Sequence, residues 1–171
     1  MKIIIFIFLI IFNLFNTSFA ENKIAFLNVN YIFNNSITGN DANKKVEKKI
    51  KELEKNIKNF TSNIKKDEEN LIKQKNILSE DDYNKKFDII DDKIKEFNKK
   101  IKIENEEINK LKKKIRSNFS EELRIILTEY SSKNSIQLII KQENVLIGSN
   151  KINITKEILE IVDSKKIKIL N

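Results

Sequence analysis

Several residue types are missing from this chain of 171 residues, and each absence excludes a class of chemistry. Cysteine is absent, so disulfides contribute nothing to the fold. Histidine is absent too, which removes Ser-His-Asp and Cys-His catalysis and the usual zinc and transition-metal ligand sets. With only two glycines, the chain has neither a glycine-rich phosphate loop nor a Gly-x-Ser-x-Gly turn. The carboxylates alternate with lysine as on solvated helix faces, so we predict a protein that is not an enzyme and uses no cofactor or metal.

Proline is also absent, and the glycines are Gly39 and Gly148, so no helix breaker lies between them. In this stretch apolar residues recur at spacings of three and four in two ladders, the pattern of one apolar stripe on each of two helices. Between the ladders, residues 78–83 indicate a stop and a restart, because Ser79 can cap the second helix and three acids suit its positive end. We therefore predict a long antiparallel helical hairpin, the arm, over residues 41–133, with its turn near residues 78–80. The residues expected to seal the seam between the two helices are Ile50, Leu53, Ile57, Phe60, Ile64, Phe87, Ile90, Ile94, Phe97 and Ile101.

Residues 1–20 have the layout of a secretory signal. Lys2 supplies a basic n-region, residues 3–12 form an unbroken apolar run, and Ser18-Phe19-Ala20 fits a small-x-small cleavage site. The apolar run is short for a membrane span, so we predict cleavage, with an uncleaved N-terminal anchor as the alternative. Since no second apolar stretch of spanning length follows, we expect a soluble mature protein that is exported from the cytoplasm.

The segments on either side of the arm, residues 21–40 and 134–171, are expected to form a small α+β body. Residues 23–29 are typical of a buried strand, and a short helix capped by Asn30 is expected after it. Gly39 is expected in a turn, where it is free to take a positive φ. Residues 136–141 and 144–148 indicate a strand hairpin, followed by a final helix that Thr155 would cap. The expected core of the body, or of an assembly that completes it, is Ile24, Phe26, Val29, Phe33, Leu138, Ile140, Val145 and Ile147.

Size and charge indicate the kinds of partner. The body has about 55 residues, which is marginal for an isolated monomer, so we expect copies of the chain to complete it. The formal net charge is +8, or +7 without Lys2, with 32 basic against 25 acidic residues. Nearly all of the basic residues are lysine, whereas arginine is preferred for bidentate phosphate recognition. We interpret the charge as a diffuse field suited to anionic clients or lipid surfaces, with no nucleic-acid site.

Some apolar residues of the arm fall off the predicted seam. On a flexible basic arm, such exposed positions can hold non-native polypeptide through many weak contacts. The alternative is that the arm's apolar residues serve only to join its two helices. The candidates for contact with a client polypeptide are Ile72, Ile77, Ile89 and Ile103.

The order of these features resembles the Skp/OmpH family of periplasmic chaperones over essentially the whole mature chain. The informative parts are the KIAFLNVNYIFNNS segment at residues 23–36, the strand segments at 136–140 and 144–147, and INITKEIL at 152–159. The resemblance implies a homotrimer in which strands of all three chains form a small barrel and three arms enclose a cavity. It also implies that unfolded outer-membrane proteins are held there without ATP, and for some members that arm Lys and Arg bind lipopolysaccharide.

The chain departs from the family pattern in three places. Asn28 and Asn153 stand where the family commonly has Asp, which puts a local capping or ionic role of these positions in doubt. The Lys-rich tail at residues 165–169 is not part of the pattern. We predict an ATP-independent periplasmic holdase for unfolded outer-membrane proteins. The alternatives are a structural coiled-coil adaptor of the envelope with a folded partner, and a basic nucleic-acid-binding coiled coil, against which the secretory signal argues.

Overall fold

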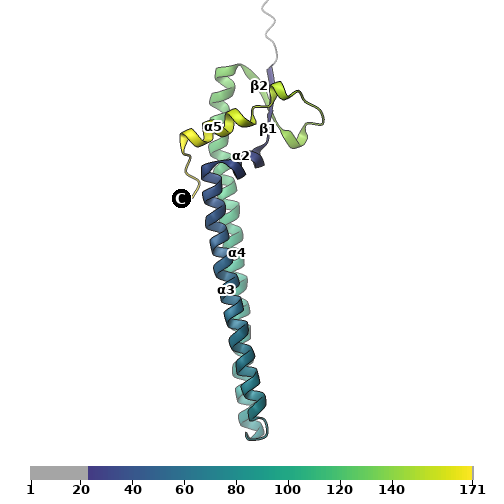
Figure 1. Ribbon diagram of the computed structural model, residues 1–171, viewed down its shortest axis with the longest axis vertical. Helices are drawn as coiled ribbons and strands as arrows, with labels where there is room; N and C mark the ends of the chain where they lie inside the picture. Colours follow the sequence, from purple (N-terminus) through teal and green to yellow (C-terminus); the bar gives the residue numbers. More distant parts are fainter. Residues whose placement is uncertain (1–22, 171) are drawn as a thin grey trace, which may run out of the picture.

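The computed structural model describes residues 23–170 and consists of a long helical arm on a small body (Figure 1). The predicted signal at residues 1–20 lies outside the described residues. The predicted combination of long helices with a small sheet is confirmed. In chain order the elements are β1 (Lys23–Leu27), α2 (Val29–Asn35), α3 (Ile37–Gln74), α4 (Glu80–Asn134), β2 (Ile136–Lys141), the short 3-10 helices η2 (Gln142–Asn144) and η3 (Asn150–Ile152), and α5 (Thr155–Lys165).

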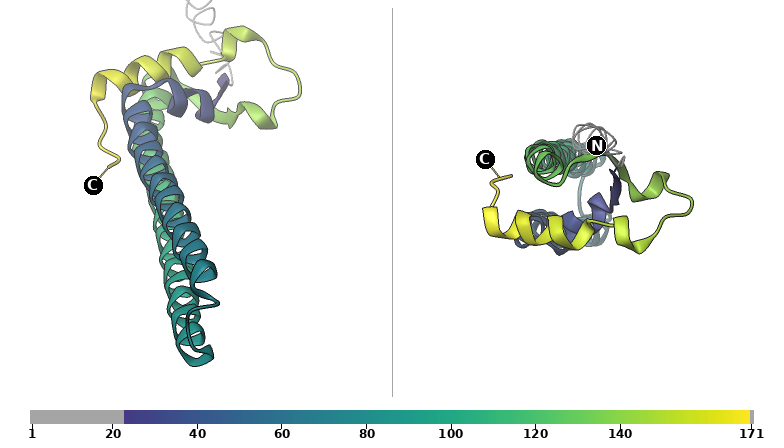
Figure 2. Two further views of the ribbon diagram at one scale, coloured as in Figure 1. Left: turned by 60° about the horizontal axis from the view of Figure 1, so that its bottom comes forward. Right: turned by 90° about the horizontal axis from the view of Figure 1, so that it is seen from above.

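The arm consists of α3 packed side by side with the first part of α4, and the two helices run in opposite directions (Figures 1 and 2). The 38 residues of α3 extend over about 57 Å at 1.5 Å per residue. Midway along the seam the rings of Phe60 and Phe97 stack with their centroids 3.7 Å apart. Nearer the turn, Lys93 Nζ lies 2.9 Å from Asp67 Oδ2 across the helix pair. Among residues 23–170, no helix combines the length and apolarity needed to cross a membrane.

Nine of the ten residues expected at the seam are buried or half-buried, and Phe87 differs. Its side chain is 55% exposed. At this level of the arm the half-buried residue of α3 is Gln74, and Lys86 Nζ donates a hydrogen bond to Gln74 Oε1 over 2.7 Å. The hydrogen bond between the helices at this level is therefore polar, and the Phe87 ring lies in solvent.

The turn at the far end of the arm is formed by residues 75–79, so α3 ends earlier than the expected turn at 78–80. Ser79 caps α4 as expected, since its Oγ accepts a hydrogen bond from the Asp82 backbone N–H over 3.2 Å. The Ser79 hydroxyl in turn donates to Asp82 Oδ2 over 2.7 Å. The serine and the aspartate therefore fix the start of α4 together, and the acids of its first turn face the positive end of the helix dipole.

The first helix of the arm, α3, begins at Ile37 and includes Gly39, so the expectation that Gly39 lies in a turn is wrong. Gly39 lies inside the first turn of α3, and no described glycine has a positive φ. The cap is Ser36, whose Oγ accepts from the Gly39 N–H over 3.1 Å. A Cβ at Gly39 would lie 1.7 Å from the carbonyl oxygen of Phe33. Glycine is required because α2 and α3 approach each other so closely, and not for its conformational freedom.

The sheet of the described chain has two strands, β1 and β2, which pair in parallel with Ile24 opposite Leu138 and Phe26 opposite Ile140. The strand hairpin expected at 136–141 and 144–148 does not form, because η2 follows β2 directly and residues 145–149 have no strand partner. A strand needs the backbone of a neighbour to satisfy its hydrogen bonds. The neighbour of β2 is β1, more than 100 residues away in the sequence, and a parallel pair of this kind requires a long connection.

Asn28 and Asn153, the two positions where the resembled family commonly has Asp, both accept hydrogen bonds at the start of a helix of the body. Asn28 Oδ1 accepts from the Tyr31 N–H over 2.7 Å and caps α2, in place of the expected Asn30. Asn153 Oδ1 accepts from both the N–H and the hydroxyl of Thr155, at 3.0 and 2.6 Å, so the expected cap Thr155 is instead the first residue of α5. Thr155 Oγ1 then accepts from the Asn28 N–H over 3.0 Å, which joins the starts of α2 and α5. An amide oxygen fulfils this role as a carboxylate would.

The C-terminal segment, residues 166–170, returns to the base of the arm (Figure 2). Lys166 ends α5 with a φ of 47°. Thr38 Oγ1 of α3 donates to the Ile167 carbonyl over 3.1 Å, and Asn118 Nδ2 of α4 donates to the Ile169 carbonyl over 3.2 Å. The side chains of Ile167 and Ile169 belong to the main hydrophobic core. The tail is therefore part of the fold and holds both arm helices where they meet the body.

We expect Ile169→Ala to lower the free energy of unfolding by about 3 kcal/mol, since the side chain is 1% exposed and its removal leaves a cavity. Urea unfolding followed by circular dichroism measures the effect. The neighbouring exposed residue provides the control, as Lys168→Ala should change stability by less than about 0.5 kcal/mol. Equal stability of the two variants would show that the tail is not packed in solution.

Candidate functional site

The exposed apolar side chains of the arm are concentrated near its far end. Ile72, Ile77 and Ile89 are 66%, 82% and 56% exposed, and Phe87, which was expected in the seam, lies in the same part of the arm. We call Ile72, Ile77, Phe87 and Ile89 the tip patch. The fourth candidate, Ile103, is 48% exposed but lies closer to the body and apart from the others. The sequence pattern did not indicate the exposure of Phe87, because the spacing of this residue fits the seam ladder.

Beside the tip patch the two helices form a shallow groove of about 210 Å³. Its lining combines the apolar Leu71, Ile89 and Ile90 with polar and charged side chains, among them Asp67 and Lys86. Leu71 and Ile90 belong, with Ile64, to a small hydrophobic cluster that is separate from the core of the body. The far end of the arm therefore has a small hydrophobic cluster of its own, and the side chains of the tip patch lie outside this cluster.

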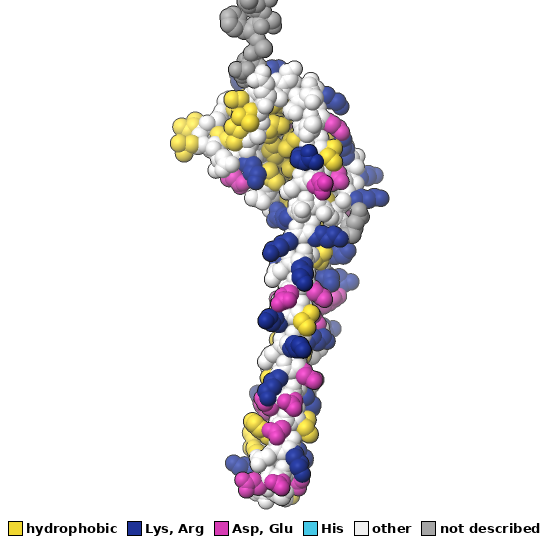
Figure 3. Space-filling model, turned by 180° about the vertical axis from the view of Figure 1, so that it is seen from behind, with side chains coloured by type: hydrophobic (Ala, Val, Ile, Leu, Met, Phe, Trp, Pro, Cys, Tyr) yellow, Lys and Arg dark blue, Asp and Glu magenta, His cyan; other side chains and the backbone are white. Residues whose placement is uncertain are grey.

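The charge of the arm is segregated along its length and is not diffuse as composition suggested. The Asp67–Lys93 contact divides the arm into a tip, residues 67–92, and a shaft, residues 41–66 and 93–116. The tip has nine carboxylates and four lysines, a net charge of −5. The shaft has nineteen basic and eight acidic residues, a net charge of +11. Figure 3 shows magenta side chains gathered around the far end of the arm and dark blue ones predominating where it leaves the body.

Several carboxylates of the arm are paired with lysines on the same helix. Lys51 Nζ lies 2.7 Å from Glu47 Oε1, and this hydrogen-bonded pair lowers the pKa of Glu47 and raises that of Lys51. Lys95 lies 2.6 Å from Asp91, whose hydrogen bond and charge raise the pKa of Lys95. These pairs are exposed and add little stability. The main effect of these ion pairs is to neutralise the charges that they contain, so that the unpaired charges of the arm dominate its interaction with an approaching molecule.

The body also leaves apolar side chains uncovered in the single chain. Of the residues expected in its core, Phe26 and Phe33 are buried, Val29, Ile140 and Val145 are half-buried, and Ile24, Leu138 and Ile147 are exposed. Leu146 and Ile147, in the loop after β2, are 98% and 91% exposed. Large exposed apolar patches beside strand edges are typical of protein–protein interfaces.

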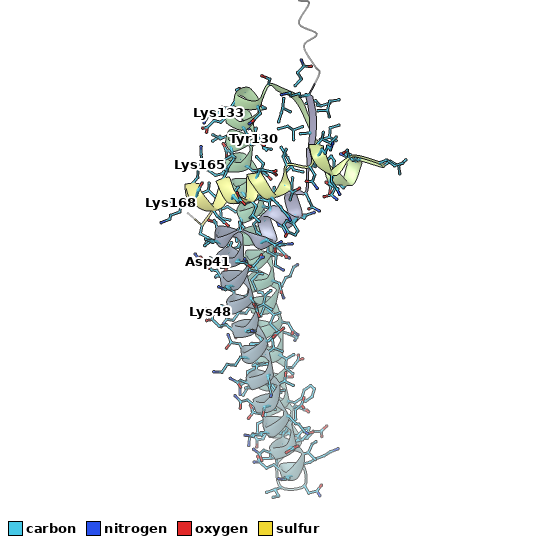
Figure 4. The ribbon with its side chains drawn as sticks, turned by 45° about the horizontal axis from the view of Figure 1, so that its top comes forward. Asp41, Lys48, Tyr130, Lys133, Lys165 and Lys168 are labelled. Carbon is cyan, nitrogen blue, oxygen red and sulfur yellow. The ribbon has the colours of Figure 1, made fainter. Side chains whose placement is uncertain are left out.

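Basic residues also surround the junction of α4 with α5. Lys165 Nζ of α5 lies 2.6 Å from Glu129 Oε2 of α4, and this contact lowers the pKa of Glu129. Figure 4 shows Lys165 closer to Tyr130 and Lys133 than Lys168, which lies past the end of α5. Burial raises the pKa of Tyr130, with a smaller contribution from the charge of Glu157. Within residues 23–170 no cluster of three or more Asp and Glu side chains is placed to hold a metal ion.

A sequence model of the family described as "Outer membrane protein (OmpH-like)" matches residues 23–162. This chain belongs to the OmpH-like family. The match spans β1, the arm, β2 and most of α5, and it confirms the resemblance drawn from the sequence. It ends before the C-terminal tail, so the segment that holds the base of the arm lies outside the family pattern.

Comparison with solved structures shows the same fold. A crystal structure from Caulobacter crescentus CB15, described as a candidate OmpH-like outer membrane chaperone, superposes with a TM-score of 0.77. The two chains are 13% identical, and the superposition covers 83% of this chain and 84% of the other. A comparison with curated proteins found no match. The long arm on a small body is thus a fold that this OmpH-like chain shares with a distant protein of very different sequence.

Proposed function

We propose that this protein is an ATP-independent periplasmic holdase, which binds unfolded outer-membrane proteins between helical arms and prevents their aggregation. The observation that carries the proposal is the arm itself, a long projection with scattered exposed apolar side chains on a highly charged surface. Each contact with a client would be weak, and affinity would come from many contacts made at once. Membership of the OmpH-like family supports the proposal.

The arms would enclose a client only if several chains assemble through the body, and we propose a homotrimer. Support comes from the exposed Ile24, Leu138 and Ile147 and from the unpaired edge of β2 in the described chain. Residues 144–148 have the composition of a strand but no partner within residues 23–170. An edge of a neighbouring chain would supply the missing hydrogen bonds, and such a head-to-tail contact closes into a ring when its rotation is three-fold. The mass of the native assembly tests this step, and a stable monomer at micromolar concentration would contradict it.

We expect purified protein lacking residues 1–20 to suppress aggregation of an outer-membrane β-barrel protein diluted from urea. Light scattering at a few-fold excess of trimer should fall to a small fraction of its value without the protein. The variant Ile77→Ser/Phe87→Ser removes two exposed side chains of the tip patch and should suppress aggregation less well. A matched control, Asn76→Ser/Asn84→Ser, changes exposed polar residues of the same region and should act like the wild type. Scattering unchanged by the wild-type protein would contradict the proposal.

The localisation and the lipid contacts form part of the same proposal. The N-terminal signal would place the protein in the periplasm, where its clients pass. Among the described residues, the shaft has the charge suited to anionic lipid or lipopolysaccharide, because its net charge is +11 whereas that of the tip is −5. One stoichiometric folded partner in a pull-down, with no affinity for unfolded chains, would favour a structural adaptor instead.

A further inference from the structure

The tip patch is the largest group of exposed apolar side chains on the arm, and its surroundings decide what it can bind. Its four members lie within 18 residues of the sequence, on both sides of the turn, and all are more than half exposed. They lie in the one part of the arm with an excess of negative charge. Apolar burial supplies attraction without selecting a partner, whereas the sign of the surrounding charge does select one.

Part of the acidic charge of the tip is neutralised by the shaft, and part is not. Asp67, Asp91 and Asp92 contact Lys93 or Lys95 at the boundary. Glu80, Asp81 and Asp88 make no ion pair within 4.0 Å in the part of the chain that the structure describes. Asp88 lies between Phe87 and Ile89 in sequence, and Glu80 and Asp81 follow Ile77 across the turn. Carboxylates that form no ion pair within the described chain are therefore close in sequence to three members of the tip patch, Ile77, Phe87 and Ile89.

We propose that the tip patch is a docking surface for segments of unfolded polypeptide in which lysine or arginine flanks apolar residues. The inference rests on the proposed holdase function and assigns the tip a class of ligand opposite in charge to that of the shaft. A segment with acidic flanks would be repelled at the tip and drawn toward the shaft. The tip would thus bind the basic segments of a client and the shaft its acidic segments. A long client chain bound at both kinds of weak site would be held extended along the arm. Surface charges are screened within about 8 Å at physiological salt, so each site acts on the segment that touches it.

Two peptides with the same apolar residues and with either lysine or glutamate at the flanking positions test the proposal. Each carries a photo-crosslinking group and is bound to the full protein lacking residues 1–20, followed by mass spectrometry of the cross-linked residues. The lysine peptide should cross-link mainly within residues 67–92 and the glutamate peptide within 41–66 or 93–116. Cross-linking of the lysine peptide mainly to the shaft or the body would overturn the proposal.

Binding measured by fluorescence anisotropy adds a test on charge alone. The variant Glu80→Gln/Asp81→Asn/Asp88→Asn should weaken binding of the lysine peptide about ten-fold and leave the glutamate peptide as tight or tighter. The control Glu52→Gln/Glu54→Gln/Glu106→Gln removes three exposed carboxylates from the shaft and should change binding of the lysine peptide by less than two-fold. Equal loss in both variants would overturn the proposal.

The failure of this inference can be distinguished from failure of the holdase proposal. If the protein suppresses aggregation but the lysine peptide shows no preference for the tip, only the charge-sorted docking is wrong. If neither peptide binds and aggregation is not suppressed, both are wrong. The tip could instead bind the basic shaft of another copy of the chain. Such binding would produce assemblies larger than the native oligomer, which salt would dissociate and the lysine peptide would not. This result would also overturn the proposal.

Discussion

Gly39→Ala should lower the free energy of unfolding by about 3 kcal/mol or more, although alanine is the better helix former. In an open helix position this substitution stabilises by about 0.5–1 kcal/mol, so the structure predicts a change of the opposite sign. The reason is that a Cβ at Gly39 would lie 1.7 Å from the oxygen and 2.8 Å from the carbon of the Phe33 carbonyl. Both are backbone atoms, which cannot rotate away as a side chain does. Relief would require α2 to move away from the start of α3.

Urea unfolding at one fixed protein concentration measures this effect, because assembly makes the stability depend on concentration. The control is Asn40→Ala, at the exposed next residue of the same helical turn, which should change the free energy of unfolding by no more than about 0.5 kcal/mol. If Gly39→Ala is as stable as the wild type, α2 and α3 do not meet as described. Failure of Gly39→Ala to fold would agree with the prediction, provided that Asn40→Ala folds.

Phe33→Ala should cost about 4 kcal/mol of the free energy of unfolding, since this side chain joins the body to the arm. Phe33 is 1% exposed. Its ring meets that of Phe119 of α4 edge-on, with centroids 5.0 Å apart. The guanidinium of Arg116, also on α4, lies 4.0 Å from the centroid of the Phe33 ring and donates to Asn30 Oδ1 over 3.3 Å. One residue of α2 is thus held from two sides by the same stretch of α4.

A series of variants separates these contacts. Phe33→Leu keeps most of the apolar volume and should cost less than about 1.5 kcal/mol. A double-mutant cycle of Phe33→Ala with Phe119→Ala should give a coupling of about 0.5–1.5 kcal/mol, the range of aromatic pairs. A loss below about 1 kcal/mol for Phe33→Ala would contradict the packing. Because Phe33 lies where the arm leaves the body, the same variant should also make the arm more mobile, which distances between spin labels on the arm and the body would record.

The local signals in the sequence predicted the parts of the fold that depend on neighbours in the chain. The alternation of three and four places Leu53, Ile64 and Ile90 in the seam, because one helix turn brings such residues to one face. Ser79 caps α4 for the same local reason. The prediction was wrong for helix caps whose position depends on where the preceding element ends. Asn28 caps α2 in place of the expected Asn30, and Ser36 caps α3 where a turn at Gly39 was expected.

The candidate site was predicted in part. The exposed Ile72, Ile77 and Ile89 follow from their position off the ladder. Phe87 fits the ladder, and only the structure shows that its side chain is exposed. The uneven distribution of acidic and basic residues along the arm can be counted in the sequence. The tip and the shaft are defined as separate regions only by the fold, in which the turn brings Asp67 and Lys93 together. The tail gave no signal of its role, because Ile167 and Ile169 are buried by Thr38, Asn118 and the core around them.

The sequence by itself determined the two long helices, the position of the turn to within a few residues, and the family resemblance. These features rest on periodicity and capping, which act over distances of one or two helix turns. Only the tertiary structure decided that β1 pairs in parallel with β2, that residues 144–148 lack a partner in the described chain, and that Gly39 serves close packing. Each of these depends on contacts between distant segments, whose energies appear only when the chain is folded. The same holds for the tip patch, because the hairpin brings its four exposed residues to one end of the arm.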